Sequence, residues 1–176
     1  MGLRSILLLP RINHDLVHDV RQQYDTLYQH VAPHISLVFP FESDMSDDTV
    51  IQVVTDVMQR FSAFDITLNR VAGEPDNGYV WLVVDQGAAI ITAMHDALYQ
   101  APIFAAHLRQ DTPYILPHMT IAQGVTPEQA QQLIVALGQT PLTIMTTIAS
   151  VSVEHILIND DSDVFCQVAL RCAHEN

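Results

Sequence analysis

Lysine is absent from this sequence, and its seven basic side chains are all arginines. Twenty Asp and Glu residues oppose them, so the formal net charge is −13 with histidines neutral. Non-specific binding to a nucleic-acid backbone relies on clustered Lys and Arg. We therefore expect no long duplex nucleic acid as a partner. A small phosphodiester, or one RNA end held in a local pocket, remains compatible with this charge.

Long apolar runs are also missing, and none reaches the ~20 residues needed to span a bilayer. The apolar start of the chain is too short for a signal peptide and fits a strand better. We expect a cytoplasmic protein, a monomer without membrane contact. The length of 176 residues and an apolar content of 49% suit one domain or a fused pair of small halves.

Cysteine and glycine are scarce. Cys166 and Cys172 are predicted on one strand roughly 20 Å apart, too far for a disulfide, so buried free thiols are expected. The six glycines are scattered and form no phosphate-binding loop. His14 and His18 lie four apart on a predicted helix, but no His-Glu-x-x-His phrase accompanies them, and a solvated helix face is expected. No metal and no cofactor are predicted.

The pattern of elements runs twice through the order strand, helix, strand, helix, strand. The predicted strands are 4–9, 33–40, 64–71, 79–84, 114–122, and two or three near 142–148, 151–158 and 164–170. The predicted helices begin at a cap on Asn13 or Asp15 and run to about Tyr28, begin at Ser46, cover 88–99, and begin at a Thr126 cap. A dense turn at 73–78 separates the halves. The sequence predicts an α+β duplicate with pseudo-twofold symmetry, a single domain 1–176 with halves of about 1–72 and 79–176.

Each half carries the same short phrase after its first helix. The phrases are Pro33-His34-Ile35-Ser36-Leu37 and Pro117-His118-Met119-Thr120-Ile121. Side chains alternate along a strand, so each histidine projects together with the hydroxyl two residues later. A pseudo-twofold axis would direct both pairs into one cleft.

Two imidazoles that face one phosphorus atom form an acid–base pair. Unperturbed histidine titrates near 6.5, so a neutral ring can take a proton from water while a protonated ring protonates the leaving oxygen. Each role is typically worth 10²–10⁴-fold in rate. The hydroxyls of Ser36 and Thr120 can donate to the phosphoryl oxygens. His34 and His118 are the candidate catalytic residues.

The paired His-x-Ser/Thr phrases resemble the signature of the two-histidine (2H) phosphoesterases, in particular the 2'-5' RNA ligase-like, RNA 2',3'-cyclic phosphodiesterase branch. The resemblance implies a bilobal α+β fold in which two antiparallel or mixed sheets surround a central cleft, with helices outside and strand exchange between the lobes possible. It also implies RNA processing or hydrolysis of a 2',3'-cyclic or 2'-5' phosphodiester, with a cyclic phosphate opening to a 2'-phosphomonoester. Gln123 stands where many such relatives carry a basic residue, and Ser36 replaces the commoner Thr.

Further residues are candidates for the cleft. Arg4 and Arg11 can bind phosphate or lie at the surface. Tyr114 can stack on a base, donate to phosphate or pack in the core. Gln123 is a further candidate for the cleft, and Trp81 can form a platform for a base but is expected in the core. An alternative function is a non-catalytic module that keeps the cleft and binds a phosphorylated ligand or a protein. A third is an interaction protein with incidental histidines.

Overall fold

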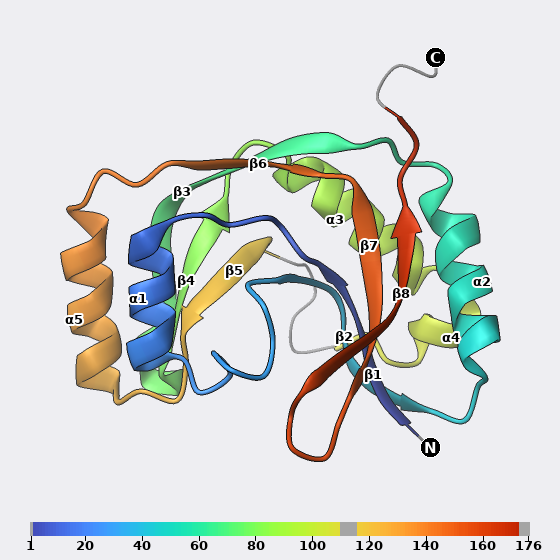
Figure 1. Ribbon diagram of the computed structural model, residues 1–176, viewed down its shortest axis with the longest axis horizontal. Coiled ribbons are helices and arrows are strands. Elements are labelled where there is room, and N and C mark those ends of the chain that lie inside the picture. The colour runs from blue at the N-terminus through green and yellow to red at the C-terminus, as the bar shows by residue number, and fades with distance from the viewer. Residues whose placement is uncertain (1, 110–115, 173–176) are drawn as a thin grey trace.

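Two four-stranded sheets form the frame of the computed structural model, which describes residues 2–109 and 116–172 (Figure 1). The strands are β1 (Gly2–Leu8), β2 (Ile35–Ser43), β3 (Phe64–Glu74), β4 (Tyr79–Val84), β5 (His118–Ala122), β6 (Ile144–Ile148), β7 (Ser150–Ile156) and β8 (Ser162–Ala169). The α-helices are α1 (Asp15–Tyr24), α2 (Asp47–Met58), α3 (Ala88–Tyr99), α4 (Pro102–Ala105) and α5 (Pro127–Gly138). A 3₁₀ turn covers Pro75–Asn77.

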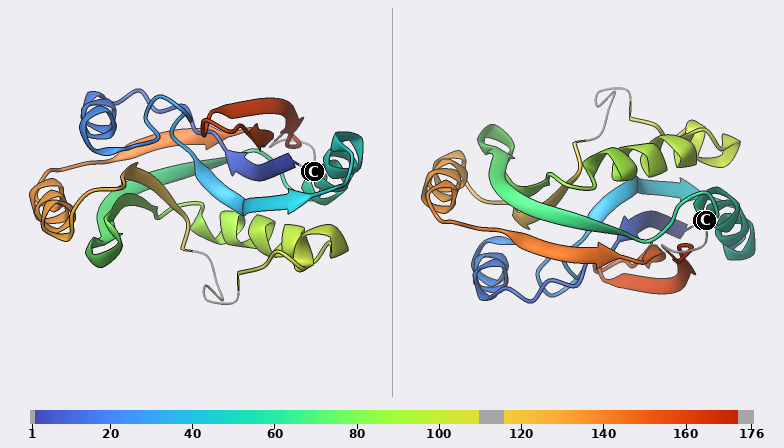
Figure 2. Two further views of the ribbon diagram at one scale, coloured as in Figure 1. Left: turned by 90° about the horizontal axis from the view of Figure 1, so that it is seen from below. Right: turned by 90° about the horizontal axis from the view of Figure 1, so that it is seen from above.

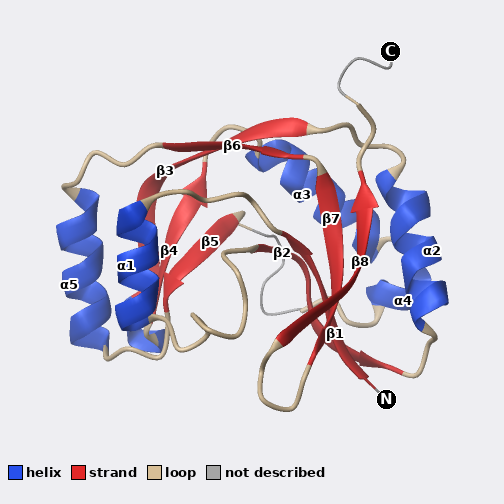
Figure 3. Cartoon of the chain, viewed as in Figure 1, coloured by secondary structure: helices blue, strands red, loops and turns tan. Residues whose placement is uncertain are grey.

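The sheet orders are β2-β1-β7-β8 and β5-β4-β3-β6, and neighbouring strands in both are antiparallel. Helices lie on the outer sides of the sheets, as Figures 2 and 3 show. The predicted α+β class with two sheets is confirmed. The sheets do not follow the halves of the sequence, because β3 joins the second sheet, while β7 and β8 join the first. The boundary at 73–78 is therefore a turn within one sheet.

Alternating burial along the strands produces the core. Ile35 and Leu37 of β2, and Met119 and Ile121 of β5, are at most 1% exposed. Each belongs to one buried apolar cluster that reaches from the first sheet through α2 and α3 to the second. One face of each motif strand is thereby fixed against the core, which leaves the other face to the histidines.

Helix starts follow the predicted caps at two places and not at a third. Ser46 and Thr126 accept from the backbone N–H three residues later, and Thr126 forms a full capping box. The caps predicted at Asn13 or Asp15 are wrong, because α1 follows His14 without a side-chain cap. The predicted end near Tyr28 is also wrong. The chain leaves the helix after Tyr24, because Asp25 is extended and bridges to Gln123.

Proline positions explain two further differences. The predicted strand 33–40 continues through Pro40 to Ser43, because β2 is an edge strand and tolerates a residue without an N–H. In the predicted strand 114–122, β5 begins only at His118, and residues 110–115 lie outside the described part of the chain. The short helix α4, which starts at Pro102, was not predicted.

Gly78 closes the turn between β3 and β4. Its φ of 71° is left-handed, and a Cβ there would meet the Val125 carbonyl oxygen at 2.3 Å. The cysteines are both free, but Cys172 lies beyond β8 and is exposed, so the predicted buried pair on one strand is wrong. No helix in the described ranges is long and apolar enough to cross a membrane.

Candidate active site

The two motif strands meet at the junction of the sheets. β2 is the edge of the first sheet, β5 is the edge of the second, and the two strands contact each other near the centre of Figure 1. His34 directly precedes β2, and His118 is the first residue of β5. Strand topology therefore brings together two phrases that lie more than 80 residues apart in the sequence.

Alternation along the strands places each histidine with its hydroxyl partner. His34 and Ser36 are both partly buried and line one pocket of about 240 Å³. His118 and Thr120 are also partly buried, and they share the strand face opposite Met119 and Ile121. Each hydroxyl is thus on the same side of its strand as the imidazole it follows.

Both imidazoles are oriented by the same local hydrogen bond. The Nδ1 of His34 lies 3.0 Å from the carbonyl oxygen of Ala32, and the Nδ1 of His118 lies 2.6 Å from that of Leu116. A carbonyl only accepts, so Nδ1 carries the proton in both rings. The proline between carbonyl and histidine restricts the backbone of this short loop. In the neutral form of each ring, Nε2 therefore carries no hydrogen and can accept a proton.

The environment favours the neutral form of both rings. Burial lowers the pKa of His34 below 6.5, against smaller opposing effects of the Ala32 carbonyl and of the Glu154 carboxylate. Burial likewise lowers the pKa of His118, against the Leu116 carbonyl, and a positive charge on His34 lowers it further. This effect fits the contact between β2 and β5, which carry the two histidine phrases.

Trp81 lies on the active-site face and not in the core, which corrects the prediction. It pairs with Thr120 across β4 and β5, and its ring centroid is 4.7 Å from that of His118. The rings are tilted by 33°, so the indole supports one side of the imidazole. Its buried Nε1 has no hydrogen-bond partner among the described residues.

A buried ion pair on and after α1 connects the loop before β2 with the residue after β5. Arg21 of α1 donates to Asp25 at 2.6 Å and to the Val31 carbonyl at 2.8 Å, in the loop that leads to His34. Asp25 also accepts from the Gln123 side chain at 2.8 Å, directly after β5. Gln123 thus ties β5 to α1 and lines a separate hollow, away from the pocket of His34 and Ser36.

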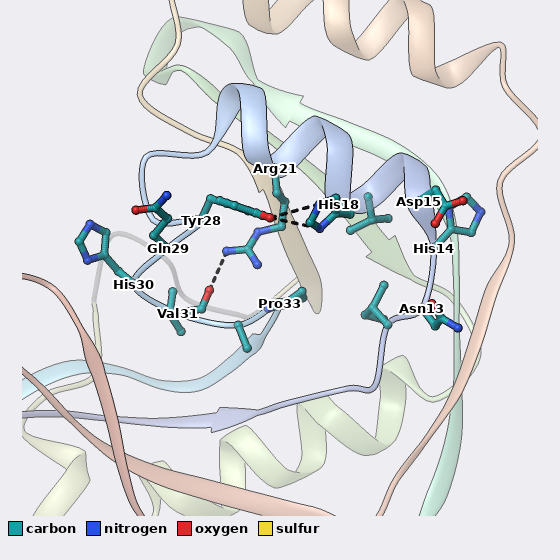
Figure 4. A pocket seen from close by; sticks show the side chains of 13 residues that line it. Asn13, His14, Asp15, His18, Arg21, Tyr28, Gln29, His30, Val31 and Pro33 are labelled. Atoms are coloured by element: carbon teal, nitrogen blue, oxygen red, sulfur yellow. Dashed lines mark hydrogen bonds between the residues drawn. The ribbon is translucent and has the colours of Figure 1, made fainter.

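A larger pocket of about 560 Å³ is lined by α1 and by the loop 28–33 that leads to His34 (Figure 4). Arg21 reaches across it to Val31, and the Tyr28 hydroxyl contacts the ring of His18 at 3.2 Å. His14 and His18 both line this pocket. Among the described residues, no group of three His, Cys, Asp or Glu side chains is arranged to hold a metal ion.

The remaining candidates are not brought to the histidines. Arg4 is on the face of β1 opposite to Ser5, which lines the pocket of His34. There it binds Asp47 at 2.8 Å and holds the start of α2. Arg11 is exposed and lines a different hollow beside residues 146–150. Tyr114 lies outside the described residues.

Four polar residues in the pocket of His34 were missed: Ser5, Glu154, Asp160 and Ser162. Glu154 is only 4% exposed and accepts from the hydroxyls of Ser5 and Ser162. Ser152 and Glu154 alternate with Val151 and Val153 in β7, and this alternation was the available signal for a polar strand face. The position of Glu154 beside His34 depends on the pairing of β7 with β1, which the alternation does not reveal.

Comparison with known proteins assigns the family. Residues 9–156 match the model of the 2'-5' RNA ligase superfamily, so the chain belongs to this superfamily of two-histidine phosphoesterases. The family predicted from the paired phrases is confirmed.

Individual relatives agree with this assignment. A protein named "Putative phosphoesterase SH1944" from Staphylococcus haemolyticus is 26% identical over 137 residues, covering 76% of this chain and 77% of that protein. Escherichia coli LigT, solved with ATP, has a TM-score of 0.56 at 14% identity, covering 97% of this chain and 98% of LigT. TT0787 of Thermus thermophilus has a TM-score of 0.65 at 8% identity, covering 98% of this chain and 100% of that protein. The solved structures share the fold.

Proposed function

We propose that the protein is a metal-independent phosphodiesterase that opens a 2',3'-cyclic or 2'-5' phosphodiester of a nucleotide or an RNA end. The observation that carries this proposal is the duplicated orientation of the histidines. Both donate Nδ1–H to the carbonyl two residues earlier, which leaves two Nε2 atoms for proton transfer at the junction of the sheets. The protein acts as a monomer in the cytoplasm.

The phosphodiester lies between the two imidazoles, and its negative charge favours protonation of one of them. The neutral ring takes a proton from water, whose oxygen attacks phosphorus. The bond from phosphorus to the leaving oxygen breaks, and the protonated ring supplies that oxygen with a proton. Ser36 and Thr120 donate to the phosphoryl oxygens, where negative charge accumulates. E. coli LigT, which has this fold, has been solved with 3'-AMP and with phosphate.

The carboxylates nearby favour His34 as the acid. Burial lowers the pKa of both rings. The buried carboxylates of Glu154 and Asp25 raise the pKa of His34, while the buried Arg21, which is paired with Asp25, lowers it. The carboxylate that raises the pKa of His118 is the exposed Glu74. A buried carboxylate is less screened and acts more strongly. The first proton is therefore placed on His34, and His118 is the base.

The test is hydrolysis of nucleoside 2',3'-cyclic phosphates in EDTA. His34→Ala and His118→Ala should each lower kcat by about 10²–10⁴-fold. His107→Ala is the matched control, because His107 packs against Phe41 and lines none of the histidine pocket. Activity that survives both motif substitutions contradicts the mechanism. Tight nucleotide binding without turnover in the wild type supports the alternative of a binding module.

A second substrate separates the two roles. A nucleoside phosphodiester of p-nitrophenol has a leaving group that needs no general acid. His34→Ala should keep most of its activity on this ester, while His118→Ala should not. Equal losses in both variants would contradict the assignment of acid and base.

A further inference from the structure

The pocket of His34 and Ser36 contains a buried carboxylate that acts on His34 only through its charge and makes no contact with the phosphate in the proposed reaction. Glu154 is 4% exposed and faces the pocket together with Ser5, its register partner on β1. No ion pair joins it to any residue in the described part of the chain. A buried carboxylate without a cation is costly unless its hydrogen bonds are satisfied, so its contacts indicate what the pocket can accept.

The contacts of Glu154 leave part of its acceptor capacity open. Ser5 donates to Oε1 at 2.6 Å, and Ser162 donates to Oε2. An ionised carboxylate offers about four acceptor positions, two on each oxygen. One position on each oxygen is thus held by a serine, and a ligand can still donate to both oxygens at once.

The part of the pocket around Glu154, beyond His34 and Ser36, disfavours a phosphate and suits a flat, uncharged group. Apolar side chains of Leu3, Leu7, Leu27, Val31 and Ile156 form most of its wall. Asp160 adds a second carboxylate to the lining. An anion would be repelled here, whereas a ring with N–H donors gains both apolar contact and hydrogen bonds. The volume of about 240 Å³ is below the ~300–1,000 Å³ of drug-sized sites and suits one ring system.

We propose that this pocket binds the base of the substrate and selects guanine, an inference that rests on the proposed phosphodiesterase function. Guanine presents two adjacent donors, N1–H and the 2-amino group, that match a carboxylate as the fork of an arginine does. Adenine, cytosine and uracil each present single donors beside acceptors. The phosphate stays at His34 while the base reaches Glu154, because His34 and Glu154 line the same pocket.

The experiment compares guanosine 2'-monophosphate with inosine 2'-monophosphate by calorimetry, because the two differ only in the 2-amino group. The wild type should bind the guanosine nucleotide at least about tenfold more tightly, because inosine keeps only one of the two donors that face the carboxylate. In Glu154→Gln the ratio should fall to about threefold or less, because an amide offers one acceptor. Glu128→Gln makes the same charge change on the exposed start of α5 and should keep the full ratio.

The outcomes separate this inference from the proposed function. Equal binding of both nucleotides, together with hydrolysis of all four cyclic nucleotides at equal rates, overturns the guanine pocket and leaves the phosphodiesterase. A guanosine preference without hydrolysis of any cyclic phosphate overturns the phosphodiesterase instead. If Glu154→Gln does not fold, Leu3→Trp narrows the pocket from a position that is 36% exposed. It should weaken guanosine binding at least tenfold and leave inorganic phosphate binding unchanged; unchanged guanosine binding overturns the inference.

Discussion

Replacing Asp25 by alanine should destabilise the protein strongly, because it isolates a buried charge. The Arg21 and Asp25 side chains are 4% and 2% exposed and lie 2.6 Å apart. Without Asp25, the Arg21 guanidinium keeps only the Val31 carbonyl as an acceptor among its described contacts. Removal of one partner of a buried pair costs about 3–5 kcal/mol. Such a loss is a large part of a typical stability of about 5–15 kcal/mol.

The measurement is urea unfolding followed by far-UV circular dichroism. With a slope of about 2 kcal/mol per molar urea, the midpoint should fall by roughly 1.5–2.5 M. Arg21→Met together with Asp25→Ala should recover much of the loss, since no buried charge then remains. Gln123→Ala should cost less, about 1.5–3 kcal/mol, because it removes one hydrogen bond to a charged group. A loss below about 1 kcal/mol for Asp25→Ala, or strict additivity in the double variant, would refute the role of this pair.

Two further predictions concern pH and backbone geometry. Burial lowers the pKa of His34 and His118 below 6.5 in the folded protein. As the pH falls below 6.5, these histidines therefore bind protons in the unfolded chain before they do so in the folded one. The free energy of unfolding is thus unaffected by the two rings above pH 6.5 and decreases as the pH falls below it. Urea midpoints at pH 5.0–7.5 should therefore show a steeper decline for the wild type than for a His34→Asn, His118→Asn double variant, and parallel curves would count against buried neutral rings. Gly78→Ala should cost about 1–3 kcal/mol through its left-handed φ, with more from the contact with the Val125 carbonyl, and a thermal midpoint equal to that of the wild type would contradict this geometry.

The sequence predicted the two motif strands because their alternation of apolar and polar residues spans only a few positions. Ile35, Leu37, Met119 and Ile121 alternate with the site residues, and their burial fixes which face holds each histidine. The family followed from the same two phrases. Strand exchange between the lobes was expected as possible, but its members β3, β7 and β8 could not be predicted, because the exchange depends on pairing over long separations.

Long-range pairing also explains which site residues were missed. Glu154 faces the pocket because β7 pairs with β1 and places it beside Ser5, a residue 149 positions away. Gln123 was a candidate for the cleft from its place after the second phrase, yet the early end of α1 at Tyr24 places Asp25 where the amide can donate to it. Neither contact has a signature within a short window of sequence.

Trp81 provides an intrinsic fluorescent probe beside His118. It is the single tryptophan of the sequence, and its ring lies against that of His118. Indole emission responds to the charge and polarity of neighbouring groups, so protonation of His118 or entry of a phosphate should change the fluorescence of the native, unlabelled chain. Equilibrium titrations and stopped-flow binding can thus observe one histidine of the proposed pair directly, without a reporter that would disturb the junction between the two sheets.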